Sequence, residues 1–328
     1  VSHNGMDVDL KMASRVIGID AIFGGHTHDG MPKPIEVKNA GGYTVVTNAG
    51  CSGKYIGVMD LDIRDHKVSG YNYKMLPIIT NLIKPDAEMV SYINKMRSTK
   101  YDENVVEARS STMSNNTNRV GKTYNEILSE ELCTTEQTLY RRGNFMGTWD
   151  QVLVNSLREE HNADFAMSAG VRWGTSVIAG HKVTMEELMT NTSMTYGETN
   201  VSEMAGSQIR DILEGIAENL FVQDPYLQSG GDMVRMGGLD YTIDPAASLG
   251  ERISNIKDDD GTPVDPSKLY KVAGWAQVSS IGNGRLMWDV AADYLRKQKH
   301  LNLTKVNHPT IKGVKENPGI ENYSGDLI

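Results

Sequence analysis

The sequence predicts an α/β (α+β) protein with two domains, and three observations point to this class. Its 328 residues exceed the length of one typical domain and can bury sizeable cores. Its apolar fraction of 39% and its charged fraction of 23% are those of an ordinary globular protein. Segments with the apolar spacing of strands alternate along the chain with segments that have the spacing of amphipathic helices.

A strand–helix–strand step opens the chain and favours a parallel sheet. Val1–Gly5 is typical of the exit of a strand, so the chain is expected to begin inside a domain. Met6–Val16 has helical apolar spacing, and Ile19–Phe23 is a short apolar run typical of a buried strand. Further strands are expected at Tyr43–Asn48, at Tyr55–Ile63 and, after a turn at Asp65–Lys67, through Tyr71 and Tyr73.

We expect a first domain over residues 1–78, a linker helix and connector over residues 79–119, and a second domain over residues 120–328. The linker helix is expected at Lys84–Met96. Helices and strands of the second domain are expected at Asn144–Glu160, Asp164–Met167, a helix capped by Thr184, Gln208–Phe221, Tyr270–Trp275 and Leu286–Arg296. A hairpin turn is expected at Asp258–Gly261, and the tail His300–Ile328 is expected to wrap the surface.

The strongest chemical signal follows the first complete strand. A glycine pair ends this strand, and His26 and His28 come directly after it. Strand ends are where parallel-sheet enzymes place their sites, and His3 follows the preceding strand exit at the same rim. An isolated His-x-His is usually a solvated turn, but this position favours a metal site. Asp29 either orients a ligand histidine or caps the turn.

Five residues of the second domain are candidates for substrate binding. Arg172 follows a strand and a glycine, where it either clamps an oxyanion or forms a surface salt bridge. Arg235 lies among glycines and apolar residues, where a charge is costly without a partner, and Asp232 either belongs to the site or pairs with it. Trp173 and Trp275 either wall a narrow channel or pack in the core.

Other features argue against several protein classes. The net charge of −9, without a basic stripe that contains aromatic residues, argues against nucleic acid as a partner. No run of about 18 apolar residues is present, so no membrane span is expected. The cysteines, Cys51 and Cys133, lack metal or redox spacing and are expected to be inert. The remaining histidines are expected at the surface: His66, His161, His181, His300 and His308.

Four motifs resemble those of the 5'-nucleotidase family of two-domain metallophosphoesterases. Ser2–Gly5 and Gly25–His28 resemble its last two metal motifs, and Gly53–Gly57 resembles the strand entry that follows them. Ala169–Arg172 resembles the arginine loop of its C-terminal substrate domain. The resemblance implies part of a metallophosphoesterase β-sandwich with flanking helices, followed by a complete C-terminal α/β domain.

The same resemblance assigns metal ligands. It implies that His3 and His26 bind one metal ion, that His28 binds a second and is catalytic, and that the other ligands lie upstream of Val1. Imidazole and carboxylate ligands suit manganese, zinc or iron, and the sequence does not choose among them. The missing N-terminal half of the first domain is therefore an expected partner of this chain.

The nucleotide-binding pattern of the family is incomplete in this chain. Nucleotidases of this family hold the base between two phenylalanines, because an aromatic face stacks on any base. The corresponding segments here are Met194–Gly197 and Trp275–Val278, and neither contains phenylalanine. The four phenylalanines of the chain, which are all expected in the core, are Phe23, Phe145, Phe165 and Phe221.

Two longer stretches, residues 24–32 and 230–238, resemble the SoxB-type thiosulfohydrolase (sulfate thiohydrolase) branch of the family. This resemblance implies a periplasmic enzyme with two manganese ions that releases sulfate from a cysteine S-thiosulfonate on a SoxYZ-type sulfur-carrier protein. It also implies roles for Arg172 and Arg235 in catalysis. A nucleotide or sugar-nucleotide hydrolase of the same family and a non-catalytic binding fragment are the alternatives.

Overall fold

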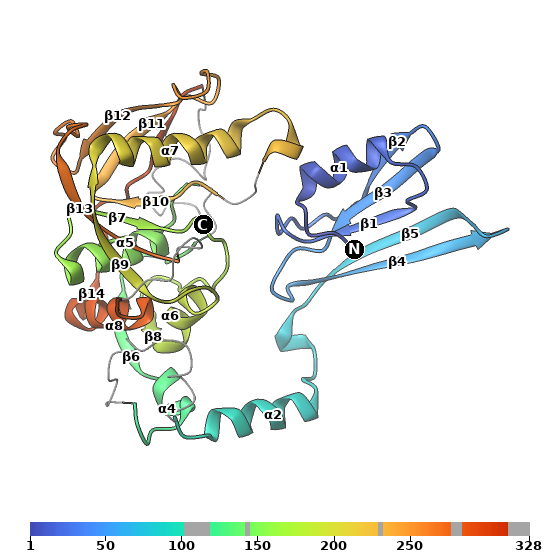
Figure 1. Cartoon of the computed structure of the whole chain (residues 1–328). Coiled ribbons are helices and arrows are strands. Elements are labelled where there is room, and N and C mark those ends of the chain that lie inside the picture. Colours follow the sequence, from blue (N-terminus) through green and yellow to red (C-terminus); the bar gives the residue numbers. More distant parts are fainter. Residues whose placement is uncertain (102–118, 142–144, 229–231, 277–283, 314–328) are drawn as a thin grey trace. The chain divides into compact units, whose positions relative to one another are not determined.

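The computed structural model describes residues 1–101, 119–141, 145–228, 232–276 and 284–313. The chain divides into two compact units, Val1–Val90 with Val222–Gly231 and Ser91–Phe221 with Asp232–Ile328 (Figure 1). Both units contain helices and small mixed sheets, so the expected α/β class is confirmed. Within the described residues, no helix has both the length and the apolar character that a membrane span requires.

The first unit contains the helix and the second strand of the expected strand–helix–strand step, but residues 1–5, which were expected to be the exit of a strand, form no strand. Its elements are α1 (Met6–Arg15), β1 (Ala21–Gly24), β2 (Ile35–Asn39), β3 (Gly42–Asn48), β4 (Tyr55–Arg64), β5 (Lys67–Pro77) and η1 (Thr80–Leu82), and the short η2 (Pro225–Leu227) also belongs to this unit. One sheet has the order β1-β3-β2, in which β1 runs parallel to β3 and β2 runs antiparallel to it. The sequence did not predict β2, because its residues alternate between charged or polar and apolar over only one short segment.

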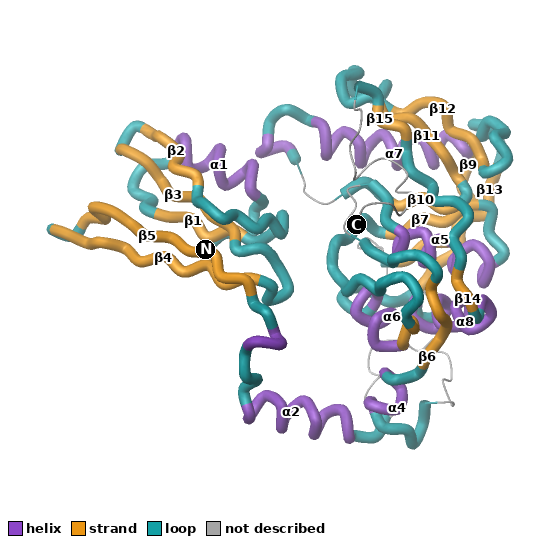
Figure 2. Tube along the Cα trace, turned by 180° about the vertical axis from the view of Figure 1, so that it is seen from behind, coloured by secondary structure: helices purple, strands orange, loops and turns teal. Residues whose placement is uncertain are grey.

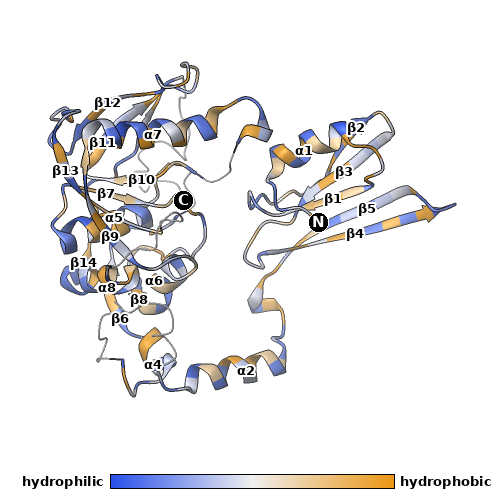
Figure 3. Ribbon diagram, in the orientation of Figure 1, coloured by the Kyte–Doolittle hydropathy of each residue, from blue (hydrophilic) through white to orange (hydrophobic). Residues whose placement is uncertain are grey.

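A long hairpin, β4–β5, forms the other sheet of the first unit. Asp65 and His66 connect its strands, and both have left-handed backbones with φ angles of 48° and 63°. Two such residues form the turn whose twist matches a hairpin. His66 is exposed, as predicted. Apolar and polar residues alternate in colour along β4 (Figure 3), yet large apolar side chains of this strand remain exposed, including Ile56 and Ile63.

The core of the first unit is thin. Its fully buried apolar cluster consists of Ala13, Ile22 and Val46, which pack α1 against the three-stranded sheet. Phe23 was expected in a core, but 40% of its surface is exposed, because it lies on the face of β1 opposite to Ile22. The other three phenylalanines are buried or half-buried, as expected.

A helix, α2 (Ala87–Ser98), lies at the boundary of the two units and corresponds to the expected linker helix. Its final turn belongs to the second unit, where Arg97 donates two hydrogen bonds of 2.8 Å to Glu186. Much of the expected connector, residues 102–118, lies outside the described residues.

The second unit has three sheets with helices around them (Figure 2). Its helices are α4 (Tyr124–Leu128), α5 (Thr148–His161), α6 (Met185–Thr192), α7 (Gly206–Phe221) and α8 (Met287–Gln298). Its strands are β6 (Glu131–Thr135), β7 (Phe165–Ser168), β8 (Lys182–Thr184), β9 (Thr199–Ala205), β10 (Arg235–Gly237), β11 (Leu239–Ile243), β12 (Ile253–Asp258), β13 (Leu269–Trp275), β14 (His300–Leu301) and β15 (Thr310–Ile311).

The central sheet of the second unit, β10-β7-β13-β9, separates two apolar cores. Because side chains alternate across a strand, Ala166 and Ala273 face one core and Phe165 and Val272 face the other. Helices α5 and α8 cover the first face, while α7 and the β12-β11-β15 sheet form the second core. This two-sided packing fixes β7 and β10, the strands whose ends carry the candidate substrate residues.

The C-terminal tail does not wrap the surface as predicted. Up to residue 313, it adds short strands to two sheets: β14 runs parallel to β6, and β15 runs parallel to β11. Leu301, Asn307 and Ile311 are buried. Two-residue strands carry almost no sequence signal, which explains the error. The rest of the tail lies outside the described residues.

Candidate functional site

Two of the three predicted metal-binding histidines meet at the rim of the first unit. The ring of His3 lies edge-on to the ring of His26, with centroids 4.8 Å apart and an interplanar angle of 74°. Their facing nitrogens, Nε2 of His3 and Nδ1 of His26, are 3.2 Å apart. This contact brings together two segments that are 23 residues apart in the sequence.

The backbone explains how these two loops meet. The amide of Ser2 donates a 2.8 Å hydrogen bond to the carbonyl of Phe23, which aligns the start of the chain with the end of β1. Gly5 then turns the chain into α1 with a φ angle of 97°, a conformation that favours glycine. A side chain at Gly5 would also approach Thr27 at 3.4 Å. The glycine therefore permits the close contact between the loops.

His28 has an unusual backbone within the same loop. Its φ angle of 61° is uncommon for a residue other than glycine and marks a position with local strain. Thr27 donates a 2.5 Å hydrogen bond to the carboxylate of Asp29, so this aspartate stabilises the turn itself. Of the two roles considered for Asp29, the structure shows the capping role.

The spacing of His3 and His26 fits a shared metal ion. Two nitrogens that both bind one tetrahedral ion at about 2.0–2.1 Å lie roughly 3.3 Å apart, close to the observed 3.2 Å. His28 does not join them, because the described part of the chain contains no group of three His, Cys, Asp or Glu side chains that could hold a metal. The residues present therefore fit part of a metal site, and the ligand roles of His3, His26 and His28 remain predictions.

In the second unit, Arg235 lies at the start of β10 and has no exposed side-chain surface. Its guanidinium donates to Asp150 over 3.2 Å, to Asp232 over 3.1 Å and to the carbonyl of Met233 over 2.9 Å. Its predicted direct contact with substrate is therefore not seen. These partners compensate its buried charge, and the substrate role of Arg235 stays a prediction.

Asp150 is the residue that sequence reasoning missed. It lies in the first turn of α5, is 0% exposed, and accepts hydrogen bonds from both Arg141, over 3.0 Å, and Arg235. It also accepts a 2.9 Å hydrogen bond from the amide of Gly147 and so caps its own helix. An acidic residue near a helix N-terminus is an ordinary capping signal, so the sequence around Asp150 did not indicate that it also pairs with two arginines.

The ion pairs continue toward solvent. Asp232 pairs with Arg172 over 3.3 Å, so these five side chains form the series Arg141, Asp150, Arg235, Asp232 and Arg172, which we call the arginine ladder. Burial raises the pKa of the Asp232 carboxyl above its ordinary value, and Arg235 and Arg172 oppose this shift. The ladder contains one more guanidinium than carboxylate, and Arg172, 19% exposed, lies at its accessible end. This arrangement can attract an anion.

Gly170 allows the loop that carries Arg172 to pass close to the Asp232 segment. A Cβ atom at this position would lie 2.5 Å from the carbonyl oxygen of Met233 and 2.8 Å from that of Asp232. Because both neighbours are backbone atoms, the close approach requires glycine. Residues 230 and 231, which precede Asp232 in the predicted glycine-rich stretch, lie outside the described residues.

The two tryptophans differ in environment. Trp275 is buried in the core, where its indole donates a 2.7 Å hydrogen bond to Ser168, so it does not wall a channel. Trp173 is half-buried next to Arg172, and a wall role stays a prediction for it. In the segment that replaces the first nucleotidase phenylalanine, Tyr196 is 48% exposed. Residues 277 and 278 of the second segment lie outside the described residues.

Two histidines expected at the surface are instead half-buried. Burial lowers the pKa of His308, and the positive charge of Arg235 lowers it further while Asp150 opposes the shift. The charges of two ladder residues thus influence the pKa of His308, which the polar tail sequence did not indicate. Burial also lowers the pKa of His161, whereas His181 and His300 are exposed as expected. Burial raises the pKa of the Cys133 thiol to about 11, which keeps it unreactive near neutral pH.

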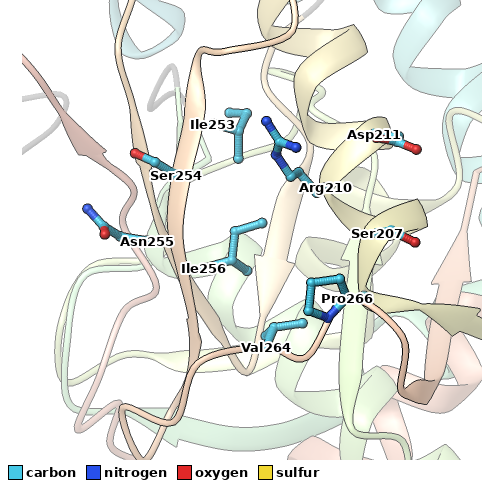
Figure 4. A pocket seen from close by; sticks show the side chains of 10 residues that line it. Ser207, Arg210, Asp211, Ile253, Ser254, Asn255, Ile256, Val264 and Pro266 are labelled. Carbon is cyan, nitrogen blue, oxygen red and sulfur yellow. The ribbon is translucent and has the colours of Figure 1, made fainter.

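A separate cavity of about 260 Å³ lies between α7 and β12 (Figure 4). Ser207, Arg210 and Asp211 line it from the helix, and Ile253 and Ile256 line it from the strand. None of the predicted site residues contributes to its lining.

Comparison with known proteins identifies the second unit. The model of the 5'-nucleotidase C-terminal domain matches residues 120–291, which is more than half of the chain. The chain is 27% identical to the trifunctional nucleotide phosphoesterase protein YfkN of Bacillus subtilis (strain 168), over 87% of this chain and 18% of the relative. It is 22% identical to the 5'-nucleotidase of Rattus norvegicus, over 59% of that protein.

Solved structures extend the likeness to both units. The sulfate thiohydrolase SoxB of Thermus thermophilus, solved with glycerol, is 29% identical and superimposes with a TM-score of 0.79, over 96% of this chain and 54% of that chain. A 5'-nucleotidase precursor, also of Thermus thermophilus, has a TM-score of 0.72 at 17% identity, over 94% of this chain and 62% of the other, and supports the fold alone. The chain thus spans 54% of the Thermus sulfate thiohydrolase and 18% of the Bacillus relative.

Proposed function

Because this chain belongs to the 5'-nucleotidase family, whose matched members are hydrolases, we propose that it forms part of a dimetal thiosulfohydrolase. The proposed reaction releases sulfate from a cysteine S-thiosulfonate on a SoxYZ-type sulfur-carrier protein in the periplasm. The observation that carries this proposal is the likeness to a sulfate thiohydrolase, at 29% identity and a TM-score of 0.79 over nearly the whole chain.

The metal-binding part of the proposal rests on the His3–His26 pair. These two imidazoles would hold one ion, His28 would contribute to a second, and manganese is the expected metal, with zinc or iron as alternatives. When bound, a pair of divalent ions supplies a hydroxide nucleophile at neutral pH and neutralises oxyanion charge. We propose that the remaining ligands correspond to a part of the thiohydrolase outside the 54% of it that this chain covers.

The arginine ladder supports an anionic substrate. Its excess of one guanidinium over carboxylate leaves net positive charge at the end occupied by Arg172. A sulfonate presents three oxygens, and a guanidinium can donate two parallel hydrogen bonds to such a group. In this proposal Arg172 binds the oxyanion, while Arg235 and Asp232 hold Arg172 in place. Trp173, which follows Arg172 directly, would border the carrier arm.

The proposed chemistry needs little help from a general acid. Water supplies an oxygen to the terminal sulfonate sulfur and loses its protons to solvent. The bond between this sulfur and the neighbouring sulfane sulfur breaks, so that sulfate leaves and a persulfide stays on the carrier cysteine. Persulfide is stable as an anion, so it can leave without a proton, unlike the alkoxide of a phosphate ester. This difference matters because no histidine other than His28 lies in the described loop after His26.

The decisive experiment uses a protein that joins this chain to the rest of its first domain. Sulfate release from thiosulfonate-loaded carrier is measured beside phosphate release from AMP, with manganese present. We expect sulfate release, and we expect Arg172→Ala to reduce it roughly a hundredfold, as for the loss of one preorganised donor. Arg210→Ala, an exposed arginine on α7, is the matched control. Phosphate release without sulfate release would contradict the proposal.

A 5'-nucleotidase or sugar-nucleotide hydrolase is the second candidate. It is favoured by the named activity of the Bacillus relative and by Tyr196, whose exposed ring can stack on a base. Tyr196→Ala should then raise the KM for AMP and leave sulfate release unchanged. In a third candidate, this chain is a non-catalytic binding fragment. Metal analysis tests that reading, since residues 1–328 alone should hold little manganese tightly.

A further inference from the structure

A buried polar cluster lies directly behind the two histidine loops of the first unit. Asp9 on α1 is 0% exposed, and Asn48 at the end of β3 is 1% exposed. Burying a carboxylate and an amide is costly unless they are hydrogen-bonded, and Oδ2 of Asp9 and Oδ1 of Asn48 are buried without a hydrogen-bond partner among the described residues. This cost stands out in a unit whose apolar core is as thin as Ala13, Ile22 and Val46.

Asp9 holds the first histidine loop. The hydroxyl of Ser2, the residue before His3, donates a 2.5 Å hydrogen bond to Oδ1 of Asp9. The same hydroxyl accepts a 3.3 Å hydrogen bond from the amide of Asn4, the residue after His3. Asp9 thus fixes both sides of His3 through one serine. The position of the Asp9 carboxylate is in turn fixed, because Asp9 belongs to the first turn of α1.

Asn48 holds the second histidine loop. Its side-chain amide donates to the hydroxyl of Thr27 over 3.4 Å, and Thr27 lies between His26 and His28. Its backbone carbonyl accepts a 3.0 Å hydrogen bond from Met31, beyond the loop. Asn48 therefore contacts the loop near its middle and anchors the chain at its far end.

Gly24 brings these two supports together. It is the register partner of Asn48 in the β1–β3 pair and is the residue before the second histidine loop begins. A Cβ atom at Gly24 would lie 2.4 Å from Oδ1 of Asn48 and 2.7 Å from Oδ2 of Asp9. Both side chains therefore point at the same spot above the Gly24 backbone, and only a residue without a side chain leaves room for both.

We propose that Asp9 and Asn48 are positioning residues that set the distance between His3 and His26. Each acts through a hydroxyl group, Ser2 for one loop and Thr27 for the other. The inference rests on the metal-binding role proposed above for the two histidines. It adds that the spacing of 3.2 Å between their nitrogens is built from within the unit, by residues that no ligand motif includes.

The test compares Asp9→Asn with Asp7→Asn in the full chain. Both aspartates lie in the first turn of α1, but Asp7 is exposed, so the control removes the same N-terminal charge without touching the buried cluster. Ser2→Ala is the second variant, because it removes the hydrogen bond to the loop and leaves the buried carboxylate in place. Gly24→Ala is the third, with Gly70→Ala as its control, since a Cβ at Gly70 meets nothing within 4 Å.

Two measurements are made on each variant. The first is the nuclear Overhauser contact between the imidazole protons of His3 and His26 without metal, which reports their distance directly. The second is the Zn²⁺ affinity by calorimetry, with His26→Ala as the reference for lost binding. For Asp9→Asn, Ser2→Ala and Gly24→Ala we expect a weaker ring contact and about tenfold weaker Zn²⁺ binding, the low end of the loss seen when residues behind metal ligands are changed.

Unchanged ring contact and unchanged Zn²⁺ affinity in Ser2→Ala and Asp9→Asn would overturn the inference. Equal losses in Asp9→Asn and Asp7→Asn would also overturn it, because they would show a general effect on α1. The ring contact separates this inference from the proposed function. If wild-type protein shows the contact but binds no Zn²⁺ through His26, the metal role fails, while a contact that still depends on Asp9 supports the positioning role.

Discussion

The two units place their candidate residues in opposite settings. In the first unit, the histidines lie on loops above a thin apolar core, and buried polar side chains support them. In the second unit, two large cores enclose the central sheet, and the arginine ladder reaches from complete burial to a partly exposed Arg172. The candidate residues of the first unit are thus held by hydrogen bonds between loops and buried polar side chains. Those of the second unit belong to a series of ion pairs that begins in the interior and ends at a partly exposed arginine.

The largest test of this contrast removes the central carboxylate of the ladder. Asp150→Ala leaves Arg141 and Arg235 buried without their shared partner, and loss of one partner of a buried ion pair costs about 3–5 kcal/mol. Tryptophan fluorescence during denaturant unfolding measures this loss in the second unit alone, because all four tryptophans lie in it. Glu159→Ala, an exposed change on the same helix, should stay within about 0.5 kcal/mol.

A cavity should distinguish the cores next. Leu153 is fully buried in α5, so Leu153→Ala should cost about 2–5 kcal/mol in the same fluorescence experiment. Leu10 of α1 is only half-buried, so Leu10→Ala should cost the first unit less, as measured by amide hydrogen exchange. Equal losses in the two units would contradict the thin-core description of the first.

The helix starts provide a smaller contrast. Thr184 caps α6 in a capping box with Glu187, whereas Gly5 caps α1 without any side-chain hydrogen bond. Thr184→Ala should lower the free energy of unfolding of the second unit by about 1 kcal/mol. Ser207→Ala, an exposed change in the first turn of α7, serves as its control. A loss below about 0.3 kcal/mol would show that tertiary contacts, not the cap, start α6.

The smallest expected effect is a pH dependence. The pKa of His308 in the fold lies below the ordinary 6.5, because of burial and the nearby Arg235, with Asp150 opposing. The folded protein therefore binds fewer protons than the unfolded chain, so this contribution to stability is present above pH 6.5 and is lost as the pH falls through the lowered pKa. His308→Gln should reduce the change of the free energy of unfolding with pH in that window. The change that remains should include the contribution of His161, whose pKa is also lowered.

Sequence reasoning succeeded where the signal was local. The turn after β1, the turn at Asp65–Lys67 and the amphipathic helix α5 each follow from a few adjacent residues. It failed where partners are distant. Sequence reasoning did not find Asp150 as the partner of Arg235, because Asp150 lies 85 residues away and also caps its own helix.

The other errors have the same physical origin. The burial of the tail depends on which strands become neighbours, and a two-residue strand such as β14 has no sequence pattern. For Trp275 the sequence left core packing and a channel wall open, and the arrangement of the strands decides for the core. Phe23 was expected inside because phenylalanine usually is, but its strand has one buried face only. Composition and periodicity describe a residue and its neighbours, whereas burial is decided by the whole sheet.

The β4–β5 hairpin has a consequence for the protein in solution. Within the described residues, its strands of 10 and 11 residues pair only with each other, so each presents one edge of unpaired amides and carbonyls. Such an edge can pair with a strand of a second molecule. Burial of the exposed Ile56 and Ile63 would favour this pairing, whereas the charged side chains of Asp60 and Lys74 oppose it. For residues 1–328 alone, self-association should therefore grow with protein concentration, and it would then affect every stability measured on the first unit.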